Sequence, residues 1–151
     1  MTTPEPSESP TQRLAVVCDT NVIVSAVLFP QSIPGQAFSH ARHAGRLLIT
    51  PELAAELRSV LMRPKFARYV TDEMRDEFLA TYLIEAEFVA VTEHVTVCRD
   101  PKDDLVLDAA INGHAACVIS GDEDLLVLTP FRDIPILRPA EYLDQFGADP
   151  S

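Results

Sequence analysis

Short apolar runs alternate with longer segments of helical periodicity along most of this chain. The first run, Leu14 to Cys18, ends at the polar residues Asp19 and Thr20. An apolar run of this length between polar boundaries predicts a buried strand. Similar runs predict further strands at residues 46–50, 116–120 and 135–137.

Cap residues and apolar spacing predict helices between these strands. Thr50 precedes Pro51, and Thr71 precedes Asp72 and Glu73, which are signals of a helix start. Gly113 predicts the end of a helix that begins at Asp100. The predicted helices are 21–28, a helix from about 36 to 44, 51–62, 71–86, 100–112 and 139–146, with a turn or short helix at 122–126.

The alternation of strands and helices predicts an α/β fold with a central, mainly parallel sheet covered by helices. We expect one domain over residues 13–146, with short extended pieces at 89–91 and 95–98. Residues 1–12 and 147–151 have no hydrophobic pattern, so we expect disordered tails there.

Composition indicates a soluble protein of a reducing compartment. No apolar stretch approaches the roughly 20 residues needed to cross a bilayer. The N-terminus has no basic and then apolar signal pattern. The three cysteines, Cys18, Cys98 and Cys117, are an odd number without metal-like spacing and fit small core positions. We therefore expect a cytoplasmic protein that does not associate with membranes.

The net charge of −11 is unevenly distributed. Residues 31–70 carry six Arg or Lys and two acids, whereas residues from 71 onward carry eighteen acids and five bases. Contacts to phosphate need cations, so the first segment keeps a nucleic-acid partner open, although solvated helix faces explain it equally well. Its basic residues, the candidates for contacts to a nucleic-acid backbone, are Arg42, Arg46, Arg58, Arg63, Lys65 and Arg68.

Carboxylates follow three of the apolar runs. Asp19 follows the first, Asp122 and Asp124 follow the strand at 116–120, and a group of acids follows 95–98. Open α/β sheets bind ligands at the carboxyl ends of their strands. A set of oxygen ligands with no histidine spacing favours Mg²⁺ or Mn²⁺ over zinc. Asp19 could also cap the following helix, but its position after an apolar run favours a site.

The helix at 100–112 carries several acids whose roles must be separated. Asp100 is a natural N-cap, and Asp103 lies in the first turn, where acids support a helix end. Asp104 and Asp108 share one face of a helix that is apolar nearly all round. We select Asp104 for the site, with Asp108 second. Which of Asp103, Asp104 and Asp108 faces Asp19 stays open.

Two other acids have competing interpretations. Glu56 lies at the edge of the apolar stripe of helix 51–62 and can reach a partly buried cleft, whereas Glu52 faces water. Asp122 fits a cap of the short helix as well as a site. The sequence contains no motif of a serine hydrolase and none of the common nucleotide-binding loops. A phosphatase site is disfavoured because Asn21 stands where a second Asp is needed, two residues after Asp19. A receiver site is disfavoured because the lysine that it needs on a late strand is missing.

Four segments in order, 18–22, 56–61, 100–104 and 120–126, make residues 14–146 resemble the PIN (PilT N-terminal) domain family. The resemblance is to the branch of VapC-type toxin components of toxin–antitoxin pairs. It implies a three-layer α/β/α fold and Mg²⁺- or Mn²⁺-dependent cleavage of RNA phosphodiesters. The implied partners are an RNA substrate, a small antitoxin protein and a second copy of the chain in a homodimer.

The resemblance also implies roles for individual residues. The catalytic acids would be Asp19, Glu56, Asp104 and Asp122, and the metal would be held by Asp19, Asp104, Asp122 and Asp124. Thr20 or Asn21, and also Ser120, match positions where family members place a polar residue that steadies the acids. The alternative function is a non-catalytic PIN module that binds RNA or a protein.

Overall fold

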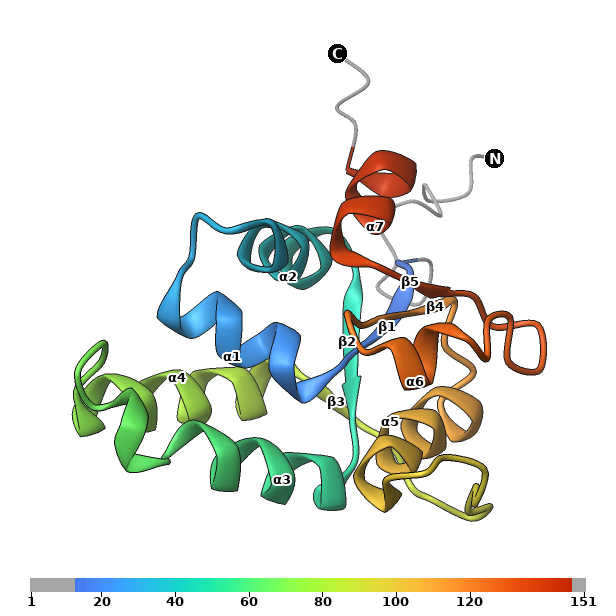
Figure 1. Ribbon diagram of the computed structural model, residues 1–151, viewed down its shortest axis with the longest axis horizontal. Coiled ribbons are helices and arrows are strands. Elements are labelled where there is room, and N and C mark those ends of the chain that lie inside the picture. Colours follow the sequence, from blue (N-terminus) through green and yellow to red (C-terminus); the bar gives the residue numbers. More distant parts are fainter. Residues whose placement is uncertain (1–12, 148–151) are drawn as a thin grey trace, which may run out of the picture.

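A five-stranded, wholly parallel sheet lies at the centre of the computed structural model, which describes residues 13–147 (Figure 1). The strand order is β3-β2-β1-β4-β5. Because the chain continues from β1 to one side of the sheet and later returns to its other side, the order reverses between β1 and β4, where such sheets bind ligands. The strands are β1 (Ala15–Cys18), β2 (Arg46–Ile49), β3 (Glu87–Phe88), β4 (Cys117–Ile119) and β5 (Ile136–Leu137).

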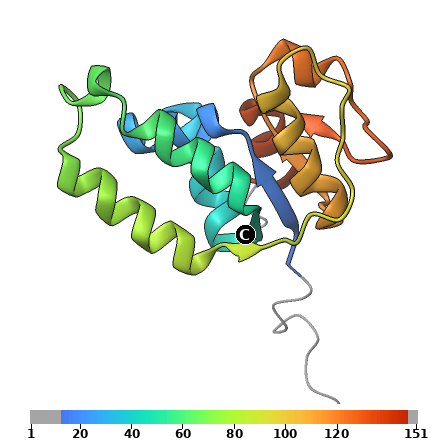
Figure 2. The ribbon, with the colours of Figure 1, turned by 90° about the horizontal axis from the view of Figure 1, so that it is seen from below.

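Helices cover both faces of the sheet, as the mainly parallel prediction requires. Figure 2 shows α3 and α5 in front of the sheet with α2 and α7 behind it, which confirms the three-layer α/β/α fold. Val16 and Val17 of the central strand are fully buried, and Val16 lies beside Leu47 on one neighbour and Cys117 on the other. The helices are α1 (Thr20–Leu28), α2 (Ile33–Ala44), α3 (Pro51–Leu61), α4 (Asp72–Glu85), α5 (Pro101–Asn112), α6 (Glu123–Leu126) and α7 (Pro139–Phe146).

The predicted capping residues start their helices. The hydroxyl of Thr50 accepts the N–H of Leu53 at 3.0 Å, and that of Thr71 accepts the N–H of Met74 at 3.1 Å. The start predicted near residue 36 was wrong, because α2 begins at Ile33 after the cap residue Ser32.

The predicted extended pieces at 89–91 and 95–98 are not strands of the sheet. The edge strand β3 ends one residue before Val89, whose N–H still bonds to the carbonyl of Ile49 at 2.8 Å. The segment 92–98 instead runs beside α5, and we call it the strap. Its backbone N–H groups bond to side chains of α5 rather than to a neighbouring strand.

Three side chains spaced four residues apart on α5 hold the strap. Asn112 accepts the N–H groups of Thr92 and Glu93 at 2.9 and 3.1 Å. Asp108 accepts the N–H of Val95 at 2.7 Å, and Asp104 accepts those of Val97 and Cys98 at 3.1 and 2.9 Å. Residues four apart share a helix face, so the three acceptors form a ladder along the strap.

The predicted tails at 1–12 and 147–151 fall outside the described residues except at Gly147, which ends α7 and donates its N–H to Leu143 at 2.8 Å. No single helix within residues 13–147 is long and apolar enough to cross a membrane. In the described part of the chain, α1 and α2 reach such a length and composition only as a pair, across a bend of 105°.

Removal of the central acceptor of the ladder should loosen the strap. Asp108 is 3% exposed, and it also lies 3.1 Å from Nδ1 of His94. Asp108→Ala leaves the N–H of Val95 without its partner, so we expect a loss of about 1–3 kcal/mol in the free energy of unfolding measured in urea. Asp108→Asn keeps an acceptor and should lose less, and Glu77→Ala on exposed α4 should stay within about 0.5 kcal/mol. Equal stability of Asp108→Ala and Glu77→Ala would contradict the ladder.

Candidate metal centre

The ends of β1 and β4 are joined by a buried hydrogen-bond chain. The backbone N–H of Asp19 bonds to the carbonyl of Ile119 at 2.9 Å, which places the two strand ends side by side. The Ser120 hydroxyl donates to the carboxylate of Asp19 at 2.7 Å and accepts the N–H of Asp122 at 3.0 Å. Asp19 is 6% exposed, and although it occupies the N-cap position of α1, its side chain makes no capping bond there.

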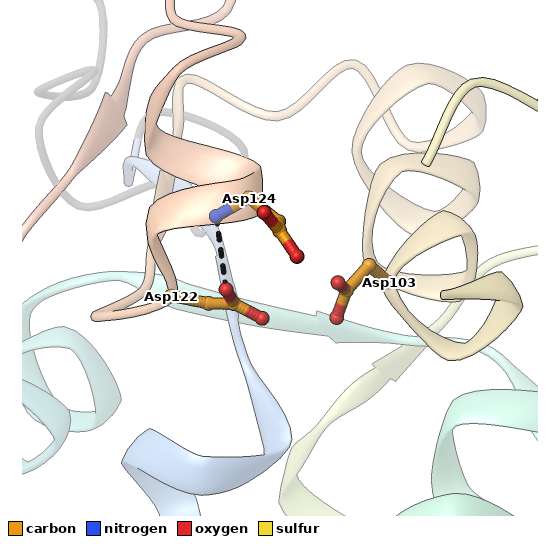
Figure 3. A group of neighbouring side chains, drawn as sticks. All are labelled: Asp103, Asp122 and Asp124. Carbon is orange, nitrogen blue, oxygen red and sulfur yellow. Dashed lines mark hydrogen bonds between the residues drawn. The ribbon is translucent and has the colours of Figure 1, made fainter. Parts of the chain in front are cut away.

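Three further carboxylates converge next to this chain. Asp103 projects from the first turn of α5, and Asp122 and Asp124 come from the start of α6 (Figure 3). One oxygen from each lies within 4.8 Å of the others, and all three are partly buried. Asp122 also caps α6 by accepting the N–H of Asp124 at 2.9 Å. The cap and the site, left as alternatives for Asp122, are therefore compatible in one residue.

Burial and mutual repulsion raise the pKa of two of these acids. Burial, followed by the charges of Asp122 and Asp19, raises the pKa of Asp103 to about 7. Burial also raises the pKa of Asp19, with Asp122 adding to the effect and the Ser120 hydroxyl opposing it. Like charges that cannot all ionise are relieved by a cation, and a group of oxygen donors suits Mg²⁺ or Mn²⁺. The residues present therefore fit a divalent cation.

Asp104, selected from the sequence for this site, is placed elsewhere by the structure. Its carboxylate accepts two N–H groups of the strap, and Asp108 accepts one, that of Val95, one turn later. These bonds explain why both acids can be buried in an apolar helix. Successive helical residues point about 100° apart, so Asp103 faces the acids while Asp104 faces the strap. The neighbouring prediction for Asp100 holds, since it caps α5 through the N–H of Lys102 at 3.0 Å.

Glu56 is not a member of the 4.8 Å group. Its side chain on α3 is 17% exposed, and its Oε1 is 4.0 Å from Nζ of Lys102 on α5. This agrees with the half-buried position predicted from the apolar stripe of α3. Thr20 is buried at the start of α1, and Asn21 beside it is exposed.

A comparison with protein-family models identifies the family of this chain. The family model for the PIN domain matches residues 15–124, which include Asp19 and the acids of α5 and α6. The chain belongs to the PIN domain family.

Two individual proteins resemble this PIN domain along most of their length. Uncharacterized protein MJ1680 of Methanocaldococcus jannaschii is 26% identical over 144 residues, covering 89% of this chain and 92% of that protein. The crystal structure of VapBC2 from Rickettsia felis, bound to a DNA fragment from their promoter, superposes with a TM-score of 0.56. At 12% identity over 83% of this chain and 98% of the other, that similarity shows a shared fold.

The basic residues selected from the sequence are not those that contact the acids of this PIN domain. Arg42 and Arg46 pair with Glu85 and Glu87 at 2.6 and 2.5 Å. They line a cavity of about 730 Å³ at the opposite end of β2 from the acids. The others, Arg58, Arg63, Lys65 and Arg68, are exposed on α3 and on the connection to α4.

Two other cations, Arg99 and Lys102, lie beside candidate acids and were not predicted from the sequence. Arg99 lies 3.5 Å from Asp124, and Lys102 lies 4.0 Å from Glu56. The available signal was their position on either side of Asp100, within the acidic segment itself.

The raised pKa of Asp103 predicts a pH-dependent stability. The unfolded chain ionises Asp103 near its ordinary pKa of 3.8, whereas the metal-free folded protein keeps the proton up to about pH 7. Its stability therefore falls as the pH rises from 5 to 8. In EDTA, the melting temperature of the wild type should drop over this range by about 2–4 °C more than that of Asp103→Asn. Parallel melting curves for the two proteins would contradict the repulsion, and Asp144→Asn on α7 serves as the control.

Proposed function

We propose that residues 13–146 form a single PIN domain. This domain is a divalent-metal-dependent ribonuclease that hydrolyses RNA phosphodiesters. The observation that carries the proposal is the convergence of Asp103, Asp122 and Asp124 beside the buried Asp19–Ser120 pair. Their place at the carboxyl ends of β1 and β4 is where open α/β sheets bind ligands. The sequence resemblance to VapC-type toxins supports RNA as the substrate.

The acids of the site divide between two roles. Asp19, Asp103, Asp122 and Asp124 would hold Mg²⁺ or Mn²⁺, with Asp103 taking the role first expected of Asp104. When bound, such a cation lowers the pKa of a coordinated water and neutralises charge on phosphate oxygens. Ser120 keeps Asp19 in place by donating a hydrogen bond to its carboxylate, which favours the ionised form. Glu56, which lies outside the close group, is the carboxylate left to orient the attacking water.

Substitutions in the first turn of α5 distinguish Asp103 from Asp104 as the third acid of the site. Asp103→Asn and Asp19→Asn should each lower Mn²⁺-stimulated cleavage of a labelled RNA on the order of 100-fold or more. Asp104→Asn should keep most of the activity, because it retains an acceptor for the strap, and its cost should appear in stability. A matched control is Asp144→Asn, an exposed acid of α7. EDTA should stop cleavage in every active variant.

The outcomes also test the alternative of a non-catalytic module. Unchanged cleavage by Asp103→Asn together with loss of cleavage by Asp104→Asn would return the third acid to Asp104. No cleavage by the wild type with Mg²⁺ or Mn²⁺, combined with binding of RNA or a protein, would replace the nuclease with a binding module. Circular dichroism of each variant confirms that the fold is intact.

A toxin role follows from the resemblance to VapC-type toxins, and the fold shared with the VapBC2 structure supports it. We therefore propose a small antitoxin protein as a partner, a homodimer as the assembly and the cytoplasm as the compartment. Induced expression of the wild type in a bacterial host should arrest growth, whereas Asp19→Asn should not. Co-expression of a small reading frame adjoining the gene should restore growth. Growth arrest by Asp19→Asn at equal protein level would contradict toxicity through the acidic site.

A further inference from the structure

Two exposed cations flank the acidic group, and both come from the segment that also supplies Asp103. Arg99 stands one residue before the cap of α5, with its Nη2 3.5 Å from Oδ1 of Asp124. Lys102 stands in the first turn of α5, with its Nζ 4.0 Å from Oε1 of Glu56. One cation therefore lies beside Asp124 of α6, and the other lies beside Glu56 of α3.

Both pairs are longer than most ion pairs among the described residues, and only Arg58–Asp76, at 3.9 Å, is comparable. The side chains of Arg99 and Lys102 are 86% and 58% exposed, and neither makes a hydrogen bond to its acid among the described residues. By contrast, Arg132 and Arg138 each lie 2.6 Å from a glutamate. Exposed pairs at such distances contribute little to folding, so the two side chains can leave the acids without disturbing the fold.

The acidic half of the chain offers few cations that could meet a polyanion. From residue 71 to residue 147, the basic residues are Arg75, Arg99, Lys102, Arg132 and Arg138. Arg75 is buried, and Arg132 and Arg138 are held by Glu93 and Glu123. Within this described range, Arg99 and Lys102 remain as exposed, loosely paired cations, and both come from the segment that carries Asp103.

We propose that Arg99 and Lys102 are substrate-positioning residues with two alternating partners. In the metal-free protein they balance the charge of Asp124 and Glu56. When the acids carry a divalent cation, the two side chains turn to phosphates of a single-stranded RNA on either side of the cleaved bond. This inference rests on the proposed ribonuclease function. It explains how a chain of net charge −11 holds a polyanion at an acidic centre.

The two roles predict opposite changes in two affinities. In Arg99→Gln/Lys102→Gln, titration calorimetry of the metal-stripped protein should show Mn²⁺ binding about 3–10-fold tighter, because competing positive charge is gone. The KM for a labelled oligoribonucleotide should rise about 10-fold while kcat changes little. With Ca²⁺ in place of Mn²⁺, fluorescence anisotropy should show a salt dependence of RNA binding reduced by about 1.4 in slope, the value for two phosphates of a single strand.

Control variants separate positioning from structure and from the proposed function. Arg99→Lys/Lys102→Arg should recover the KM, and Arg132→Gln should change neither affinity. RNA affinity and salt slope equal to the wild type, or weaker Mn²⁺ binding, in the double glutamine variant would overturn the inference while leaving the nuclease intact. Absence of Mn²⁺ binding and RNA cleavage in the wild type would instead remove the proposed function itself.

Discussion

The hydrogen bond from Ser120 to Asp19 is the interaction on which the site depends. It crosses from the end of β4 to the end of β1 at 2.7 Å, between a fully buried serine and a carboxylate that is 6% exposed. A buried carboxylate without a partner would be costly, so this bond allows Asp19 to be buried at the end of the central strand. The same hydroxyl accepts the N–H of Asp122. One serine therefore helps to position two acids that follow neighbouring strands.

A second constraint acts through α5, which serves two surfaces at once. Asp103 in its first turn faces the acids of α6, whereas Asp104, Asp108 and Asn112 face the strap. Because the strap is tied to the helix by side-chain acceptors, its backbone needs no neighbouring strand. The first turn of α5 is in turn closed by Asp100, which accepts the N–H of Lys102. The position of Asp103 therefore depends on contacts along the whole length of the helix.

The electrostatics of the site follow from this crowding. Burial and the neighbouring charges raise the pKa of both Asp103 and Asp19. The arrangement is unfavourable for an empty acidic cluster and favourable for one that binds a cation.

The sequence by itself determined the α/β class, the parallel sheet and most element boundaries. Local signals decide these features, since Thr50, Thr71 and Asp100 bond to backbone groups only two or three residues away. It also determined that Asp19 lies at the end of a buried strand. Family membership was predicted on motifs in order and is confirmed by the match over residues 15–124.

Tertiary structure alone decided the direction of the acids on α5 and the cations that face them. Adjacent residues of a buried helix differ by about 100° in direction, and an apolar surrounding does not tell a metal ligand from an acceptor of backbone N–H groups. Asp104 and the strap residues it binds are close in sequence, but nothing local predicts that the strap lies against α5. Arg99 and Lys102 likewise gain meaning only from α6 and α3, which the fold brings to them from distant parts of the chain.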